Sequence, residues 1–408
     1  MYLEILKLVL VFFIIIGIMW LKKPLSIAVA AASVAAVLLF QLPVSTAATA
    51  VRDGALSSST IEVLLVLYTL TYLQRMMEDR KNLSNAQLAM NGLFNNRRIN
   101  VSIVPFILGM LPAASTVIIC GPIVRGSVGD ELTTEEKACI TSYFRHISES
   151  FLPTYTTIFI AITLSGGRVT TSSFILAMIP MVILLFAVGW IVYLRKIPKD
   201  SGIVPDKPKA FYWKLLVKSI WPIALAIVLI LFFRLRVPLA VLICIVVNIF
   251  VNRFRPAELI SFLRTAFEPK LLISSLLVMI FKEILTATGV VTVMPALFSS
   301  LPIPSFLIYA LIFFFSAVVA GNQAAVILCM PMAMASLAPG APGLALFVLL
   351  MSIDYVAMQI SPVHVCLTLC AEDYGVSLSK MIKKTLPLVT LFTLAVFVYY
   401  GILTALGF

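Results

Sequence analysis

Polar side chains interrupt the apolar sequence at four breaks, and they are the residues most able to bind a ligand. Each break has a proline or glycine with polar residues beside it: Pro112 with Ser115 and Thr116, Pro153 with Thr154, Gly321 with Asn322 and Gln323, and Pro362 with Ser361 and His364. Ser361 is expected to cap the helix that Pro362 begins, and Pro153 to begin the matching one. Helix N-termini at such breaks suit an anion such as a carboxylate, and exposed carbonyls suit Na⁺. The alternative is that these side chains only satisfy local backbone or pack helices.

Ionisable residues inside apolar segments form a second group. Arg145, His146 and Glu149 lie in one segment and Asp354 in another. Such residues are costly in a membrane and usually functional, and Arg145, Glu149 and Asp354 are the candidates for charge balance or proton coupling. Arg145 can pair with Asp354, or each can pair with a neighbour such as Glu149, and a locking salt bridge is an equal alternative. His364 is either a ligand or proton contact, or a satisfied hydrogen-bonding group.

These residues recur at one spacing. The run Val117-Ile118-Ile119-Cys120-Gly121-Pro122 is echoed by Val326-Ile327-Leu328-Cys329-Met330-Pro331, a separation of 209 residues (326 − 117). The same separation relates Pro153 to Pro362, and Arg145 to Asp354. An apolar segment with a polar break, present once in each half, is typical of the central binding site of a transporter built from repeats.

Composition places the chain in a membrane. Of its 408 residues, 61% are hydrophobic and 12% charged, and the mean hydropathy is +1.09. The net charge of +12 falls mostly in short loops, which indicates membrane orientation rather than nucleic-acid binding. Six scattered cysteines without a CxxC motif predict neither a disulfide nor a metal framework. The first apolar run, 3–20, is expected to be a retained span rather than a secretory signal.

The elements that must position the polar residues follow from the apolar runs. The spans are expected at 3–20, 25–42, 61–74, 138–164 and 173–194, then at 213–233, 238–252, 271–288, 344–370 and 386–406. Two further runs, 99–124 and 304–337, have arms too short to cross a core of about 30 Å, so we expect re-entrant hairpins. Residues 44–60 are expected to form a polar loop, and 290–301 an amphipathic stretch.

The predicted fold is therefore an all-α polytopic membrane protein, with about ten transmembrane helices and two re-entrant hairpins. Residues 1–195 form the first repeat, 196–213 a cytoplasmic linker and 214–408 the second repeat. Five crossings per repeat make the topology inverted. With the linker in the cytoplasm and both termini outside, the inside loops hold 23 Lys and Arg and the outside loops hold 4, as the positive-inside rule requires.

Enzyme signatures are missing from the sequence. It contains no HExxH, GxSxG or GxxxxGK[ST] motif, and only two histidines. We therefore expect no enzyme activity and no cofactor, apart from Na⁺ as a possible coupling ion near Ser115 and Asn322.

Two short runs complete the pattern: Leu111-Pro112-Ala113-Ala114-Ser115 and Ser361-Pro362-Val363-His364-Val365-Cys366. With the repeated hairpins and broken helices, the chain resembles the ion transporter superfamily, which includes C4-dicarboxylate, citrate and gluconate permeases. Within it, the chain resembles an uncharacterised prokaryotic membrane family, domain of unknown function 401. The resemblance implies an inner-membrane homodimer with an elevator-like transport unit, in which Ser-Asn-Thr motifs at the hairpin tips hold Na⁺ and a carboxylate. Here the first tip lacks the Asn, and the second lacks the flanking Ser and Thr.

The expected function is secondary active transport of a small organic anion, coupled to Na⁺ or H⁺, with the lipid bilayer as surroundings and no nucleic-acid partner. A cation/proton antiporter on the same fold is one alternative, because it needs carboxylates but no anion-binding tips. A non-transporting membrane assembly or scaffold protein is the other.

Overall fold

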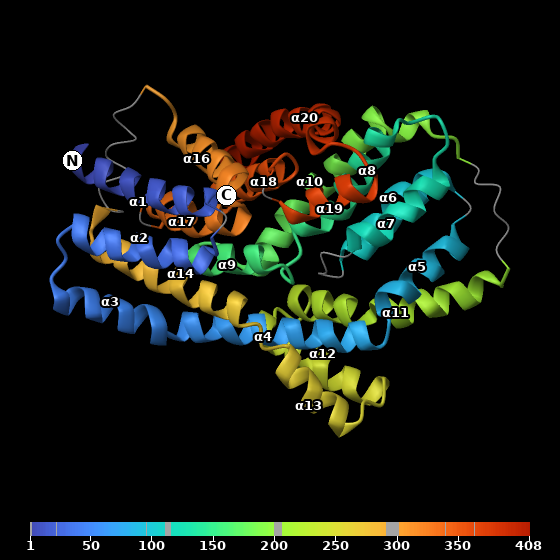
Figure 1. The fold of residues 1–408 in the computed structure, drawn as a ribbon, viewed down its shortest axis with the longest axis horizontal. Coiled ribbons are helices and arrows are strands. Elements are labelled where there is room, and N and C mark those ends of the chain that lie inside the picture. The colour runs from blue at the N-terminus through green and yellow to red at the C-terminus, as the bar shows by residue number, and fades with distance from the viewer. Residues whose placement is uncertain are drawn as a thin grey trace.

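The computed structural model describes residues 2–21, 23–94, 96–110, 116–199, 206–290, 302–338, 340–362 and 364–408. These residues form helices and contain no β-strand, which confirms the all-α prediction. Most helices run along the long axis of the molecule (Figure 1). In that view α3 (Val44–Leu56) and α4 (Ser58–Asp79) follow one edge, α20 (Leu378–Ala405) lies at the opposite edge, and α13 (Pro256–Thr265) projects outward.

The remaining helices of the first half are α1 (Tyr2–Trp20), α2 (Leu25–Leu39), α5 (Asn82–Leu93), α6 (Arg97–Gly109), α7 (Thr116–Ser127), α8 (Thr134–His146), α9 (Thr156–Leu164) and α10 (Thr171–Val192). Two 3₁₀ turns, η1 (Ile147–Ser150) and η2 (Leu194–Lys196), follow α8 and α10. Those of the second half are α11 (Lys209–Leu231), α12 (Val237–Val251), α14 (Pro269–Ala287), α16 (Ser305–Ala320), α17 (Asn322–Ala335), α18 (Leu344–Met358) and α19 (Val365–Asp373). Helix α11 thus begins inside the range expected as linker.

Several helices are suited to a membrane. Among the described residues α10, α11 and α20 are long and apolar enough to cross one, and α3 with α4, bent by 41°, passes as a fourth. Other apolar helices, including α2, α12, α16, α17 and α18, are shorter. The chain is therefore a helical membrane protein. The count of ten crossings stays a prediction.

One sequence expectation was wrong. Residues 44–60 were expected as a polar loop, but they form α3 and the start of α4. The segment is rich in alanine, which favours helix, and Ser57 caps α4 by accepting a hydrogen bond from the Thr60 N–H at 3.3 Å. The polar side chains of the segment predict a loop, but its helix propensity and the Ser57 cap favour the helices that the structure has. Of the amphipathic stretch 290–301, residues 291–301 lie outside the described residues.

Helices of the two halves pack against each other throughout. Both α2 and α3 lie on α14, α5 lies on α11, and α4 lies on α12. The contact between α3 and α14 is so close that a Cβ at Gly54 would lie 2.6 Å from the Ile280 Cα. Among the broken helices, α9 packs on α17, and α19 packs on α7 and α8, so the breaks of the two halves lie in one region.

Candidate functional site

The hairpin breaks separate α6 from α7 and α16 from α17. Helix α7 begins at Thr116, and Pro112 and Ser115 lie outside the described residues. Between α16 and α17 stands Gly321, with φ +88° and ψ 160°. That backbone conformation is essentially restricted to glycine, so Gly321 permits the chain to leave one helix and start the next at Asn322.

The other two breaks interrupt the paired segments α8–α9 and α18–α19, but their caps differ from the prediction. Ser361 is not the N-cap of α19, because the chain first makes a turn in which the His364 N–H donates to the Ser361 carbonyl at 3.3 Å. The N-cap is His364. Similarly, α9 begins at Thr156 with Tyr155 as its N-cap, after a turn from Leu152, and not at Pro153.

In each half, a residue of the second break donates a hydrogen bond to the helix that precedes the first break, and the two acceptors occupy matched positions. The Tyr155 hydroxyl donates to the carbonyl of Gly109 in α6, and the Ser361 hydroxyl donates to the carbonyl of Val318 in α16 at 2.8 Å. Gly109 and Val318 are 209 residues apart, and each lies in the last turn of its helix. Carbonyls there lack partners within the helix, so each half uses its second break to satisfy its first.

Two buried charges lie beside these breaks. Arg145 is 1% exposed and pairs with Glu149 one turn further along the chain. Asp354 is 3% exposed and accepts a hydrogen bond from the Asn322 amide at 3.1 Å, while its Oδ1 has no hydrogen-bond partner among the described residues. Of the pairings that the sequence left open, the structure forms the one between Arg145 and Glu149.

Two cavities adjoin this region. The smaller, about 30 Å³, is lined by Glu149, Asp354, Asn322 and Tyr355 among others, and is large enough for one water-sized occupant. The larger, about 280 Å³, has these polar or charged lining residues: Thr71, Gln74, Arg145, Glu149, Thr154, Tyr155, Thr156, Thr157, Glu268 and Cys366. Glu149, Tyr155 and Thr157 line both, so the two cavities are neighbours.

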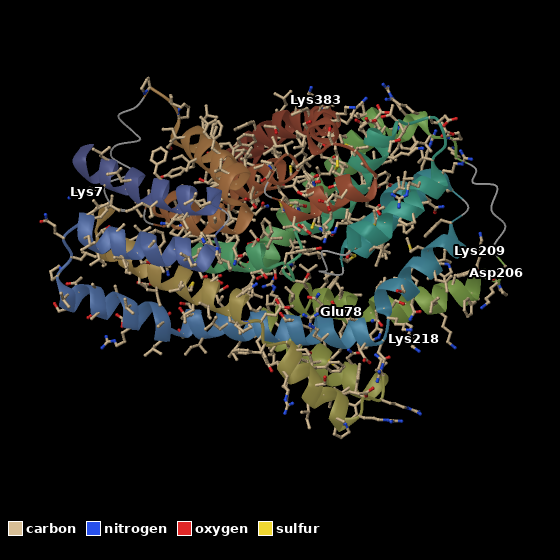
Figure 2. All side chains as sticks on the ribbon, in the orientation of Figure 1. Lys7, Glu78, Asp206, Lys209, Lys218 and Lys383 are labelled. Carbon is tan, nitrogen blue, oxygen red and sulfur yellow. The ribbon has the colours of Figure 1, made fainter. Side chains whose placement is uncertain are left out.

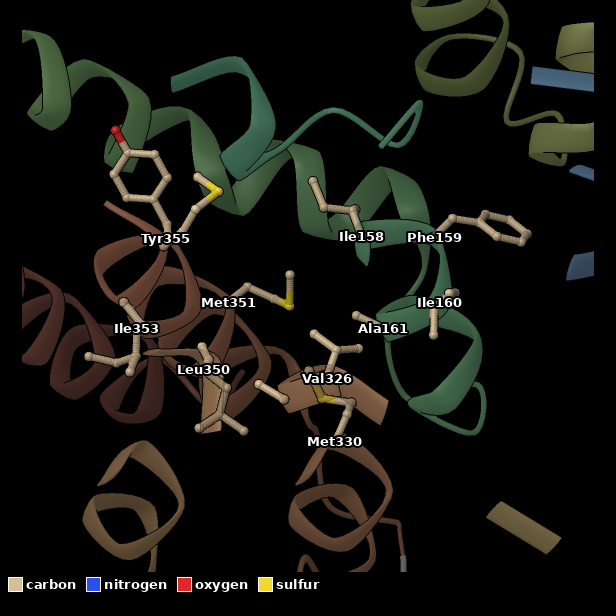
Figure 3. Packing of buried hydrophobic residues seen from close by; sticks show 14 of the residues in the cluster. Ile158, Phe159, Ile160, Ala161, Val326, Met330, Leu350, Met351, Ile353 and Tyr355 are labelled. Carbon is tan, nitrogen blue, oxygen red and sulfur yellow. The ribbon is translucent and has the colours of Figure 1, made fainter. Parts of the chain in front are cut away.

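An apolar wall supports the smaller cavity. Figure 3 shows Ile158 and Ala161 of α9 facing Val326 of α17 and Met351 of α18. All four are nearly completely buried. Helix α18, which carries Asp354, thus packs against α17, which in turn packs against α9.

The structure brings together only part of the predicted site. Thr154, Asn322, Arg145, Glu149 and Asp354 line the cavities. The rest line neither cavity. Ser361 donates a hydrogen bond to α16, and His364 lies beside His146. Thr116 is buried in α7, and the buried Nε2 of Gln323 has no hydrogen-bond partner among the described residues. Pro153 and Pro362 occupy the turns of their breaks.

Three lining or adjoining residues were missed: Tyr155, Tyr355 and Cys366. The 209-residue spacing contained a signal for two of them, because it relates Tyr355 to His146 and Tyr155 to the predicted His364. Cys366 is one of the six scattered cysteines for which no metal framework was predicted.

One protein family matches the part of the chain that contains the whole candidate site. Residues 5–403 match the model of a family described as a protein of unknown function (DUF401). No curated protein matches the chain. The function must therefore be argued from the geometry.

Proposed function

From the premise that the chain belongs to the DUF401 family, we propose that it is a secondary active transporter of a small organic anion, coupled to Na⁺ or H⁺. We place it in the prokaryotic inner membrane and in the ion transporter superfamily, as a homodimer with an elevator-like mechanism. The observation that carries the proposal is the meeting of broken helices from both halves around Arg145 and Asp354.

The anion would occupy the larger cavity. Its volume of about 280 Å³ is close to the lower end of small-molecule sites, which suits a substrate of a few carbon atoms. Arg145 supplies a guanidinium, and Thr154 a buried hydroxyl that has no hydrogen-bond partner among the described residues. The N-terminus of α9, which begins at Thr156, adds free N–H groups.

The coupling ion would occupy the smaller cavity. Asp354 is buried, its Oδ2 accepts a hydrogen bond from the neutral amide of Asn322, and its Oδ1 has no hydrogen-bond partner in the described part of the chain. A proton or a Na⁺ ion there would offset the cost of a buried carboxylate. Asn322 begins the second arm of a hairpin and bonds to Asp354. Binding of the ion in the smaller cavity would therefore be linked to the position of this hairpin.

The inverted arrangement has two supports. The matched acceptors Gly109 and Val318 occupy equivalent places in the two halves. In addition, Lys209 and Lys218, which we assign to the cytoplasmic side, lie toward the opposite end of the molecule from Lys7 near the outer N-terminus (Figure 2).

A cation/proton antiporter is the second candidate, favoured by one observation. Glu149 and Asp354, two acidic residues, line the same small cavity. A cation site needs no more than such carboxylates and nearby neutral oxygens.

The test is the thermal stability of the detergent-purified protein with a panel of organic acids, with and without Na⁺, at two pH values. A ligand at a hundredfold excess over its Kd stabilises the native state by about 2.7 kcal/mol. We expect a shift with one acid class. Thr154→Val, in the larger cavity, should abolish the shift, and Asn322→Ala, in the smaller cavity, should abolish its dependence on Na⁺ or pH. The matched control is Asn85→Ala, whose amide bonds only to the Arg80 carbonyl, away from the cavities.

The outcomes separate the candidates. A shift with an acid, lost in Thr154→Val and retained in Asn85→Ala, supports the anion transporter. A response to Na⁺ or pH alone favours the antiporter, and no response to any of them contradicts both.

A further inference from the structure

The chain's only two histidines meet at the breaks. His146 is the last residue of α8 and His364 precedes α19, yet their Nε2 atoms lie 3.0 Å apart across 218 residues of sequence. The Cys366 Sγ lies within 4.8 Å of a ring nitrogen of each histidine. His146 and Cys366 are buried, and His364 is half-buried. One potential metal ligand thus comes from the first half and two from the second.

The orientation of His146 is fixed by its other nitrogen. Its Nδ1 lies 2.6 Å from the Ser142 carbonyl, which can only accept, so Nδ1 carries the proton and donates. The Ser142 hydroxyl lies 3.1 Å from the same nitrogen. The Nε2 lone pair is therefore directed away from α8 and toward His364. Histidines that bind metals are held in this way by a hydrogen bond from the second nitrogen.

Two imidazoles and a thiol form a donor set for a borderline transition-metal ion. Zn²⁺ binds histidine nitrogen at about 2.0–2.1 Å and thiolate sulfur at about 2.3 Å, with tetrahedral geometry. That geometry puts two bound nitrogens slightly more than 3 Å apart, close to the observed separation. We propose that His146, His364 and Cys366 form a Zn²⁺-binding site.

The fourth coordination position would face the larger cavity, because Cys366 is one of its lining residues. Zinc sites with three protein ligands keep the remaining position for water or a ligand. Cys366 loses its proton on binding, and the resulting thiolate offsets part of the metal charge. The nearby Arg145 is already paired with Glu149. The site goes beyond the proposed transport and does not depend on it.

The experiment is a Co²⁺ titration of the full-length, detergent-purified protein after treatment with a chelator. Co²⁺ is a spectroscopic substitute for Zn²⁺, and a thiolate ligand gives it a charge-transfer band in the near ultraviolet. We expect one equivalent of Co²⁺ to produce this band and Zn²⁺ to abolish it. Cys366→Ser should remove the band and weaken Zn²⁺ binding by about 10–100-fold or more, since changes even in outer-shell partners have effects of that size.

The matched control is Cys370→Ser, one turn along the same helix, whose thiol donates to the Ala138 carbonyl at 3.4 Å. It should retain the band. If Cys366→Ser does not fold, His364→Gln replaces it, with Zn²⁺-induced thermal stabilisation as the readout: present in wild type and lost in the variant. No band in wild type, or a band that survives Cys366→Ser, would overturn the proposal. The organic-acid shifts that test transport are measured on chelator-treated wild-type protein, so the two proposals can fail independently.

Discussion

The two halves of the molecule use the same backbone plan around opposite charges. In the first half Arg145 is balanced by Glu149 from its own segment, one turn away. At the matched position in the second half stands Asp354, which accepts a hydrogen bond from the amide of Asn322 in the hairpin. The matched carbonyls of Gly109 and Val318 each accept a hydrogen bond from the second break of their own half, the first from Tyr155 and the second from Ser361. The halves therefore share a scaffold, and in the second half the charge is bonded to the start of a hairpin arm.

This difference assigns different tasks to two regions. We call the region around Arg145 and Glu149 the first corner, and the region around Asp354 and Asn322 the second corner. The pair between Arg145 and Glu149 lies within one segment and moves with it, so the first corner is expected to be a fixed part of the site. A carboxylate bonded across two elements changes its surroundings when either element moves. We therefore expect the second corner to respond to the coupling ion, and the following substitutions test this contrast.

The largest effect is expected at the first corner. Replacing Arg145 with Met leaves Glu149 without its buried partner, and breaking such a pair costs about 3–5 kcal/mol of unfolding free energy. Thermal unfolding in detergent measures the loss. The control is Arg52→Met, whose pair with Asp53 is exposed and worth about 0–1 kcal/mol. Equal effects of the two substitutions would show that the central pair is not a fixed element.

The next effect concerns how closely the first corner packs. A Cβ on Gly109 would overlap the Arg145 carbonyl, and its neighbour the Ser148 hydroxyl would lie at 2.6 Å. We expect Gly109→Ala to destabilise by about 1–3 kcal/mol through overpacking. At Gly126, where nothing lies within 4 Å, the same substitution should be neutral or stabilising. A stable Gly109→Ala protein would contradict the close approach of α6 to α8.

A smaller change in stability, with a larger change in response, is expected at the second corner. Asp354→Asn preserves the shape but removes the charge, so we expect a gain of about 1 kcal/mol, since a buried amide is less costly than a carboxylate. The shift of the unfolding temperature with Na⁺ or pH should disappear. Asp373→Asn, which breaks an ion pair with Arg125, should retain that shift. A retained shift in Asp354→Asn would exclude Asp354 as the coupling residue.

The smallest effect lies outside the spans, where a charge pair is partly exposed. Hydrogen bonds from Arg80, and then from the Arg255 N–H, lower the pKa of Glu258 in α13. A lowered carboxylate pKa stabilises the folded state above the ordinary Glu pKa, and this contribution is lost as pH falls through the folded value. Hydrogen exchange of α13 should therefore quicken in acid relative to Glu258→Gln. Parallel pH profiles in the two proteins would show that the contact contributes nothing.

The sequence determined the features that depend on local chemistry. Its apolar runs required a helical membrane protein, and its 209-residue spacing related the breaks of the two halves. The start of α17 at Asn322 also followed from the sequence, because the glycine at this break acts on its own backbone. The resemblance to the DUF401 family also came from short runs at the breaks, residues 111–115 and 361–366.

Tertiary structure alone decided which side chains meet. The partner of Arg145, the role of Ser361 as a donor to α16, and the approach of His146 to His364 join residues on different turns or different helices. Periodicity and spacing state which residues share a helix face, but not how the faces of separate helices are set against one another. Those contacts depend on the packing of whole helices, as the close approach of Gly109 to Arg145 illustrates.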